Sequence, residues 1–175
     1  MKRALSYPAK FMNNLMDRIF SLLGAVAAAQ FPQFYGQYVQ RLGGHLEELR
    51  RTVETYRSAA ADLGLTLKEY IEQHLDAGSE LFTSSGGVMA GLVERLQDLE
   101  SAFIALTEAS ALTRWWVFLQ EIDWEIGRQT LSYFTPGVPT TAEGFIYAGF
   151  GLLLGWGLYS LLKGLLDTVA GKLSG

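Results

Sequence analysis

The sequence has no cysteine and only two histidines, His45 and His74. Without cysteine the chain has no disulfides, no thiolate nucleophile and no cysteine-ligated zinc or iron–sulfur site. His45 precedes Glu48 by three residues on one helix face, a spacing that suits two metal ligands, but a stable site needs a larger ligand set. We therefore expect no bound metal, no cofactor and no catalytic residue.

Enzyme motifs are also lacking. No serine, histidine and aspartate follow one another in an order typical of a catalytic triad. The glycine-rich stretch "SSGGVMAG" lacks the lysine and the preceding strand of a phosphate-binding loop. The sequence thus favours a non-enzymatic protein, and a metal-dependent periplasmic enzyme that uses His45 stays as a weaker alternative.

Positive charge is scarce in the middle of the chain. Residues 35 to 143 hold 16 of the 18 acids and 8 of the 14 bases, whereas the two ends together hold 6 bases and 2 acids. Phosphate binding needs clustered lysine and arginine, so this acidic middle argues against nucleic acid as a partner. The asymmetry indicates that the middle and the ends face different surroundings.

A long uncharged run, "GFIYAGFGLLLGWGLYSLL", covers residues 144 to 162. Its 19 residues would rise about 28 Å in a helix, close to the thickness of the hydrocarbon layer of a bilayer. Thr140 and Glu143 have the spacing of a capping box before it, and Lys163 follows its far end. We predict a membrane helix here, with a buried core helix of a soluble bundle as the alternative.

Small residues recur along one side of that run. The spacing of 4, 3 and 4 places them on one helix face, and such a face allows close approach of another helix in lipid. We predict that this small-residue face packs against a membrane helix. Its members are Gly144, Ala148, Gly151 and Gly155.

The first apolar segment has 22 uncharged residues, from Ile19 to Gln40. A secretory signal peptide is one interpretation, because basic residues precede it and Ala27-Ala28-Ala29 resembles a cleavage site. The basic region is long for a signal peptide and contains Asp17. We therefore expect a retained membrane helix from about Met12 to Tyr35, whose Gly24, Ala25 and Ala28 also form a small surface.

The middle region is patterned as helices. Apolar residues at heptad spacing from Tyr35 to Leu63 predict that the first membrane helix continues outside the membrane, with a bend at Gly43-Gly44. A capping box, Thr66 with Glu69, starts a shorter helix that carries Phe82 on its apolar side. We expect a break at residues 84 to 87, followed by one very long helix from Val88 to about Ser132 that returns antiparallel to the first.

Three tryptophans, Trp115, Trp116 and Trp124, stand near the end of that returning helix. They suit either an anchor at the lipid headgroup level or a contact surface for another protein. Packing inside the bundle core is the alternative.

Two stretches of the chain resemble a family of small bacterial inner-membrane proteins known only as a domain of unknown function. In the first stretch the matching residues are Gln30, Pro32, Phe34, Gln37, Tyr38, Gln40, Arg41 and Leu42, and in the second they are Asp123, Glu125, Phe134, Pro136, Pro139 and Gly144. The resemblance implies an architecture with a retained first helix and brings no catalytic residues.

The predicted fold is an all-α membrane protein with two transmembrane helices joined by a long antiparallel helical bundle or stalk. Its parts are a cytoplasmic N-terminus and first span (1–35), a periplasmic helical domain (36–138), and a second span with a cytoplasmic C-terminus (139–175). The basic ends place both termini on the cytoplasmic side of a bacterial inner membrane. We expect an accessory or scaffold subunit, or a homo-oligomer, whose partners are the bilayer and other membrane subunits. The alternative is an oligomeric channel or transporter.

Overall fold

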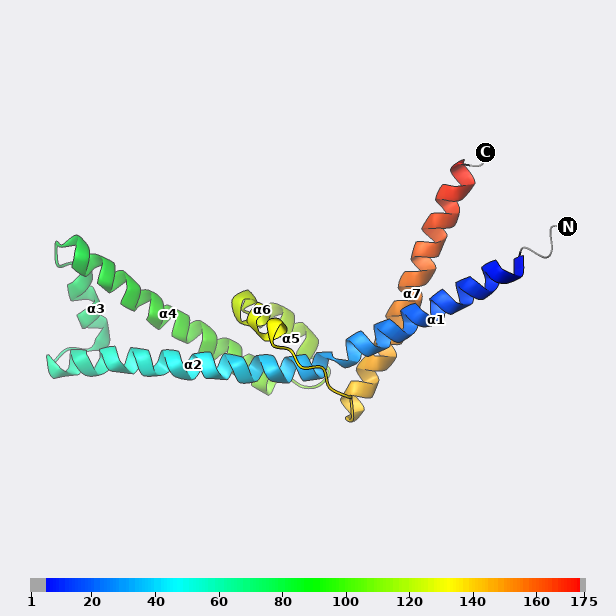
Figure 1. Ribbon diagram of the computed structural model, residues 1–175. Coiled ribbons are helices and arrows are strands. Elements are labelled where there is room, and N and C mark those ends of the chain that lie inside the picture. The colour runs from blue at the N-terminus through cyan, green and yellow to red at the C-terminus, as the bar shows by residue number, and fades with distance from the viewer. Residues whose placement is uncertain (1–5, 174–175) are drawn as a thin grey trace. The chain divides into compact units, whose positions relative to one another are not determined.

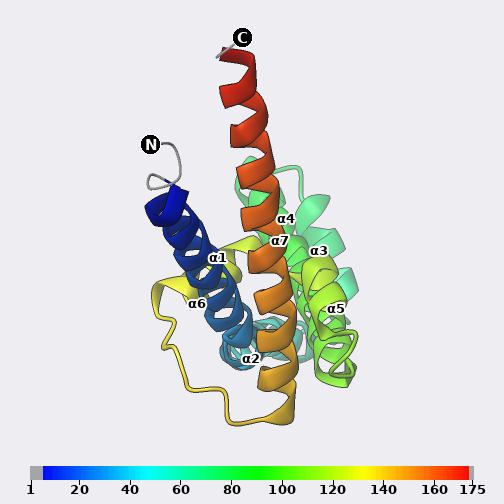
Figure 2. The same cartoon turned by 90° about the vertical axis from the view of Figure 1, so that its right-hand side faces the viewer.

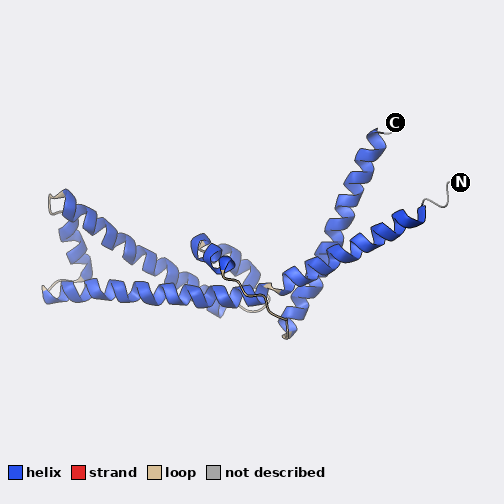
Figure 3. Ribbon diagram, in the orientation of Figure 1, coloured by secondary structure: helices blue, strands red, loops and turns tan. Residues whose placement is uncertain are grey.

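The computed structural model describes residues 6–173, and these residues contain seven helices and no strand (Figure 3). The chain divides into two compact units. The hairpin unit comprises the chain up to Tyr35 and the chain from Phe134 onward, and the helical unit comprises Gly36–Tyr133. The all-helical fold class is confirmed.

The hairpin unit is built from α1 (Ser6–Ala29) and α7 (Ala142–Leu173). The two helices lie side by side and run in opposite directions (Figures 1 and 2), because Phe20 of α1 contacts Tyr159 while Ala28 contacts Gly151. Among the described residues, α7 is the one helix long and apolar enough to cross a membrane, over Ala142–Leu165.

The first helix does not run on as predicted. α1 ends at Ala29, and α2 (Phe31–Asp62) starts two residues later. Pro32 has no N–H with which to continue the hydrogen-bond ladder to Ala28, so a helix interior is interrupted there. The N–H of Gln30 instead bonds the Ala27 carbonyl oxygen at 3.2 Å, a tightened final turn.

Both predicted ends of the last helix are wrong. The helix starts one residue late, because Thr141 rather than Thr140 caps it, and the Thr141 hydroxyl accepts from the Gly144 N–H at 3.1 Å. At the other end α7 continues past Lys163 to Leu173. Gly164 directly follows Lys163, but it does not have the positive φ of a capping glycine and stands inside α7, so the helix does not stop there.

The helical unit is organised around α2, which continues without a break through Gly43-Gly44, where the sequence predicted a bend. α4 (Glu80–Glu108) runs antiparallel to α2, as Gly43 lies against Phe103 and Arg50 pairs with Glu100. A Cβ at Gly43 would lie 3.1 Å from the Phe103 ring, so this glycine makes room for an aromatic side chain.

The turn from α2 to α4 contains the short helix α3 (Leu67–Leu75). Gly64 ends α2 with a φ of 73°, which a side chain would strain. The predicted capping box of Thr66 and Glu69 is confirmed. Phe82 belongs to α4 and not to α3, because the chain turns at Gly78, whose φ is 65°.

The predicted single long helix from Val88 to Ser132 is wrong. α4 begins earlier and continues through residues 84 to 87, where Gly86 lets α3 approach: a Cβ there would lie 3.0 Å from the Leu75 nitrogen. After Glu108 the chain leaves the helix and forms α5 (Arg114–Glu121) and α6 (Trp124–Ser132). Asp123 caps α6, and this capping residue separates the last two helices.

The core of the helical unit consists of apolar side chains from five helices, α2 to α6. Tyr38, Leu42, Val53 and Leu106 are almost completely buried. Leu42 and Val53 belong to the heptad face predicted for α2. That face also contains Val39 and Leu63, but Tyr38 is buried rather than Val39, and Leu63 is exposed. The remaining buried apolar side chains of this unit are Leu46, Ala60, Ile71, Met89, Leu99, Ala102, Phe118 and Ile126.

Candidate functional site

The closest helix contact in the chain lies between α1 and α7 at three glycines. A Cβ added to Gly151 would be 2.1 Å from the Gly24 carbonyl oxygen, and one added to Gly24 would be 2.3 Å from the Gly151 carbonyl oxygen. A Cβ at Gly155 would be 2.3 Å from the carbonyl oxygen of Phe20. Any side chain at these positions would collide with backbone, so the two helices touch main chain to main chain.

The small-residue face is therefore divided between two neighbours. Gly151 and Gly155 meet α1 of the same chain, next to Ala28 and Ser21 respectively. Gly144 instead lies against the preceding loop, where a Cβ would be 2.7 Å from the Cβ of Pro139. Ala148, between them, is half-buried.

Aromatic pairs flank the glycine contact on both sides. The rings of Phe20 and Tyr159 are 5.6 Å apart between centroids, and those of Phe31 and Tyr147 are 5.1 Å apart. Such tilted pairs add about 0.5–1.5 kcal/mol beyond the area they bury. The pairs fix the register of α7 against α1 and the first turn of α2.

Outside this contact, the apolar side chains of the hairpin unit point away from the protein. Only 11% of the most apolar stretch of α7 is buried. Leu154 is 72% exposed, and Leu22 of α1 is 64% exposed. The other large apolar side chains of this unit with exposed surfaces are Leu15, Ile19, Leu23, Val26, Val138, Phe145, Ile146, Phe150, Leu152, Leu153, Trp156, Leu158, Leu161, Leu162 and Leu165.

A side-chain amide closes the base of the hairpin. Gln30 donates to the Gly137 carbonyl oxygen at 3.1 Å and accepts from the Gly137 N–H at 3.0 Å. Beside it, the rings of Phe34 and Phe134 are 5.6 Å apart. These contacts hold the loop before α7 against the start of α2.

A polar junction joins α2, α4 and α6 in the helical unit. The Tyr38 hydroxyl accepts from the Asp123 N–H at 2.8 Å, and Arg95 forms an ion pair with the Asp123 carboxylate. Asp123 also accepts from the N–H groups of Glu125 and Ile126, both at 3.0 Å. The junction therefore satisfies the first turn of α6 and anchors it to two neighbouring helices.

Two ionisable groups of the junction have shifted pKa values. Burial raises the pKa of the Tyr38 phenol, because the charged phenolate would be poorly solvated. Burial alone would also raise the pKa of Asp123, but the hydrogen bonds from Ile126 and Arg95 outweigh it and lower that pKa. Asp123 is thus held as a carboxylate.

The three tryptophans lie on α5 and α6 and do not fill the core. Trp115 and Trp116 are each about half exposed, and Trp124 is 76% exposed. The rings of Trp115 and Trp116 meet edge to face at 5.7 Å between centroids. Leu112 and Leu119 are exposed nearby in the sequence, so this surface is strongly apolar.

Neither histidine lies in a metal-binding cluster. Within residues 6–173, no group of three or more histidine, aspartate or glutamate side chains is arranged to hold a metal ion. His45 is exposed on α2, and His74 bonds the Tyr70 carbonyl oxygen through Nδ1 at 2.8 Å.

Sequence reasoning missed the polar contacts that hold these elements together. Gln30 with Gly137 and Tyr38 with Asp123 join residues 107 and 85 positions apart, and no local spacing reveals such pairs. Three of the four, Gln30, Tyr38 and Asp123, are among the residues that carry the family resemblance, which was the available signal. Those stretches meet in space at Gln30, at Phe34 and at Tyr38.

The model of the family described as "Protein of unknown function (DUF2937)" matches residues 12–171. No curated protein and no solved structure matches the chain. The chain belongs to this family.

Proposed function

We propose that this family member is a membrane protein that acts by association, as an accessory or scaffold subunit of a larger membrane complex or as a homo-oligomer. In this proposal α1 and α7 cross the bilayer together, and the helical unit provides a docking domain at one membrane surface. One observation carries the proposal. α1 and α7 contact each other through their glycines, and the large apolar side chains on the other faces of both helices are exposed.

The exposed side chains of α7 support a location in lipid. A soluble protein rarely exposes a contiguous apolar patch larger than a few hundred Å². On α7 large apolar side chains are exposed from Phe145 to Leu165. Apolar side chains can face the hydrocarbon of a bilayer without the free-energy cost of exposing them to water.

The packing of α1 supports a second span. Phe20, Gly24 and Ala28 contact the middle of α7, so α1 shares its environment over these residues. Leu22, Leu23 and Val26 on the other side of α1 are exposed. The antiparallel register also brings Arg18 and Lys163 toward the same end of the hairpin, where charge suits a membrane surface.

Basic residues support an orientation with both termini in the cytoplasm of a bacterium and the helical unit in the periplasm. The bases outside residues 35–143 are Lys2, Arg3, Lys10, Arg18, Lys163 and Lys172. Cytoplasmic flanks of membrane helices carry this excess of positive charge.

The apolar surfaces that remain exposed favour association with another protein as the function. Gly151 and Gly155 are already covered by α1, so a partner must use other surfaces. The apolar outer face of the hairpin and the aromatic surface of Trp115, Trp116 and Trp124 are available. The channel alternative has less support, since residues 144–162 contain no acidic, basic or histidine side chain to line a polar path.

Native mass spectrometry of the full-length protein released gently from its membrane tests the proposal. We expect more than one copy of the chain or a stoichiometric foreign subunit, and Trp115→Ala with Trp116→Ala should reduce that association while the helical content stays unchanged. A monomer without partners would contradict association.

Topology is tested separately with single cysteines, because the chain has no background thiol. Ser58→Cys should react with an impermeant maleimide in spheroplasts, and Ser174→Cys should react only after lysis. The reverse pattern would overturn the orientation, and extraction of the protein by alkaline carbonate would overturn the membrane location.

A further inference from the structure

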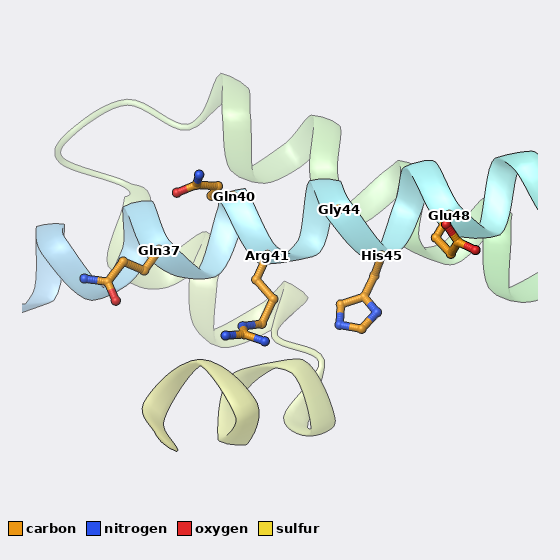
Figure 4. Close-up of a pocket in the computed structure, with 6 residues that line it drawn as sticks. All are labelled: Gln37, Gln40, Arg41, Gly44, His45 and Glu48. Atoms are coloured by element: carbon orange, nitrogen blue, oxygen red, sulfur yellow. The ribbon is translucent and has the colours of Figure 1, made fainter. Parts of the chain in front are cut away.

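A polar groove runs along α2 near the start of the helical unit (Figure 4). It has a volume of about 510 Å³ and is open to solvent on one side. The view shows Gln37, Arg41 and His45 pointing to the same side of the helix. The lining residues are Gln37, Gln40, Arg41, Gly44, His45 and Glu48.

Arg41 gives the groove a positive charge that no carboxylate of the described residues neutralises. Its guanidinium carbon lies 5.4 Å from the centroid of the Tyr133 ring, in a cation–π contact. Among the described residues, the Arg41 guanidinium takes part in no hydrogen bond and no ion pair. The one carboxylate of the lining, Glu48, pairs with Arg51 at 3.2 Å.

The floor of the groove is left empty by a glycine. A Cβ added to Gly44 would meet nothing within 4 Å. Gln37, Arg41, Gly44 and Glu48 follow at spacings of 4, 3 and 4, so they share one helix face. A guanidinium and an imidazole beside an open floor form a pair of donors suited to an oxyanion such as phosphate.

The groove residues stand close, along the chain, to the points where the helical unit begins and ends. Arg41 follows Tyr35, the last residue of the first hairpin segment, by six residues. Tyr133, which Arg41 contacts, directly precedes Phe134, where the hairpin unit resumes. Both residues are therefore near in sequence to the segments that the proposed function places in the membrane.

We infer that this groove binds the phosphate of an anionic lipid headgroup, with Arg41 supplying the charge and two parallel N–H donors. His45 and Gln37 flank the phosphate, and the open floor at Gly44 admits it. The inference rests on the proposed membrane location and adds to it a specific lipid class at the surface of the helical unit.

The test measures lipid choice by the full-length protein in detergent. Phosphatidylglycerol and phosphatidylcholine with identical acyl chains are added in equal amounts, and bound lipid is counted by native mass spectrometry. The acyl contribution is the same for both, so the ratio of bound lipids reports the headgroup. We expect about a tenfold preference for phosphatidylglycerol, the size of one charge-assisted interaction.

Two variants should lower that preference to near unity by different routes. Arg41→Gln removes the charge, and Gly44→Leu keeps every charge but fills the floor. Arg128→Gln, which removes an exposed arginine of α6 outside the groove, and Gly87→Leu, at an open helical glycine of α4, are the matched controls and should keep the preference. Circular dichroism checks that all four variants fold.

Each alternative result overturns a defined statement. Equal binding of the two lipids by the wild type, or a preference retained in Arg41→Gln and Gly44→Leu, contradicts the lipid site. Loss of the preference in excess inorganic phosphate would assign the groove to a free phosphate ion instead. If the wild-type protein is extracted from membranes by alkaline carbonate, the proposed function itself fails, whereas a membrane-embedded protein without lipid preference refutes this inference alone.

Discussion

The hairpin unit and the helical unit are both helical, but they reach close packing in opposite ways. In the hairpin unit glycines bring two backbones into contact, and the large side chains point outward. In the helical unit large side chains such as Tyr38 and Leu42 fill the space between helices. The ion pairs found among the described residues, including Arg50 with Glu100, also lie in the helical unit. In the proposed membrane location, lipid would solvate the hairpin unit and water the helical unit, and this difference in packing is the one expected between two such surroundings.

The largest effect should come from placing a side chain in the hairpin contact. We expect Gly151→Leu to destabilise the α1–α7 pair by about 3 kcal/mol or more, because the new Cβ would overlap backbone. Thermal unfolding in detergent, followed by circular dichroism, measures it. Gly149→Leu makes the same change on the same helix where a Cβ meets nothing within 4 Å, and it should leave the melting temperature nearly unchanged. Equal melting of the two variants would contradict the close contact.

The second largest difference between the two units should come from truncating one leucine in each. Leu42→Ala removes a fully buried side chain and should cost about 2–5 kcal/mol of the free energy of unfolding. Leu154→Ala removes an equally large side chain that is 72% exposed, and in detergent it should cost far less. Chemical denaturation of both variants provides the comparison. A large loss in Leu154→Ala would indicate that another protein surface covers α7.

An intermediate effect is expected from pH at the junction of the helical unit. The pKa of Asp123 is lowered in the folded protein, so its carboxylate stabilises the fold above the pKa of the unfolded chain. This stabilisation should be lost as the pH falls below about 4 and toward the folded pKa. Asp123→Asn should cost about 1 kcal/mol at neutral pH and flatten the acid dependence of the melting temperature. An unchanged acid dependence in Asp123→Asn would refute the assignment.

The smallest effect concerns two adjacent glycines of α2. Gly44→Ala should stabilise the helical unit by about 0.5–1 kcal/mol, because alanine is the better helix former and its Cβ meets open space. Gly43→Ala should lose that gain, since its Cβ would lie 3.1 Å from the Phe103 ring. Urea unfolding measures the free energy of unfolding of both variants. Equal stabilisation by both would show that the Phe103 ring moves aside without cost.

The sequence predicted helix content well because helical periodicity and capping are local. The Thr66–Glu69 capping box is an example, since all of its partners lie within four residues. Breaks were predicted less well. The glycines at 43, 44, 86 and 87 favoured bends, yet α2 and α4 pass through them because neighbouring helices use two of the positions for close approach. Conversely, the break after Glu108 has no glycine or proline to announce it.

The candidate site was predictable only in part for the same reason. The small-residue face could be recognised from its spacing, but which helix would cover Gly151 and which loop would cover Gly144 depends on tertiary contacts. The Arg41 groove needs α6 to bring Tyr133 beside α2, and that placement follows from the polar junction at Asp123. Contacts between residues so distant in sequence produce no periodic pattern from which they could be predicted.

The amide of Gln30, bonded in both directions to Gly137, has a consequence for how such a chain can change over evolutionary time. The points where the helical unit leaves and rejoins the hairpin are held beside each other, with the rings of Phe34 and Phe134 5.6 Å apart. Neighbouring termini are the condition under which one domain can be inserted into another. The 98 residues from Gly36 to Tyr133 therefore behave as an insert in a two-helix host. Such an insert can lengthen, shorten or be exchanged while the host keeps its own helix–helix contacts.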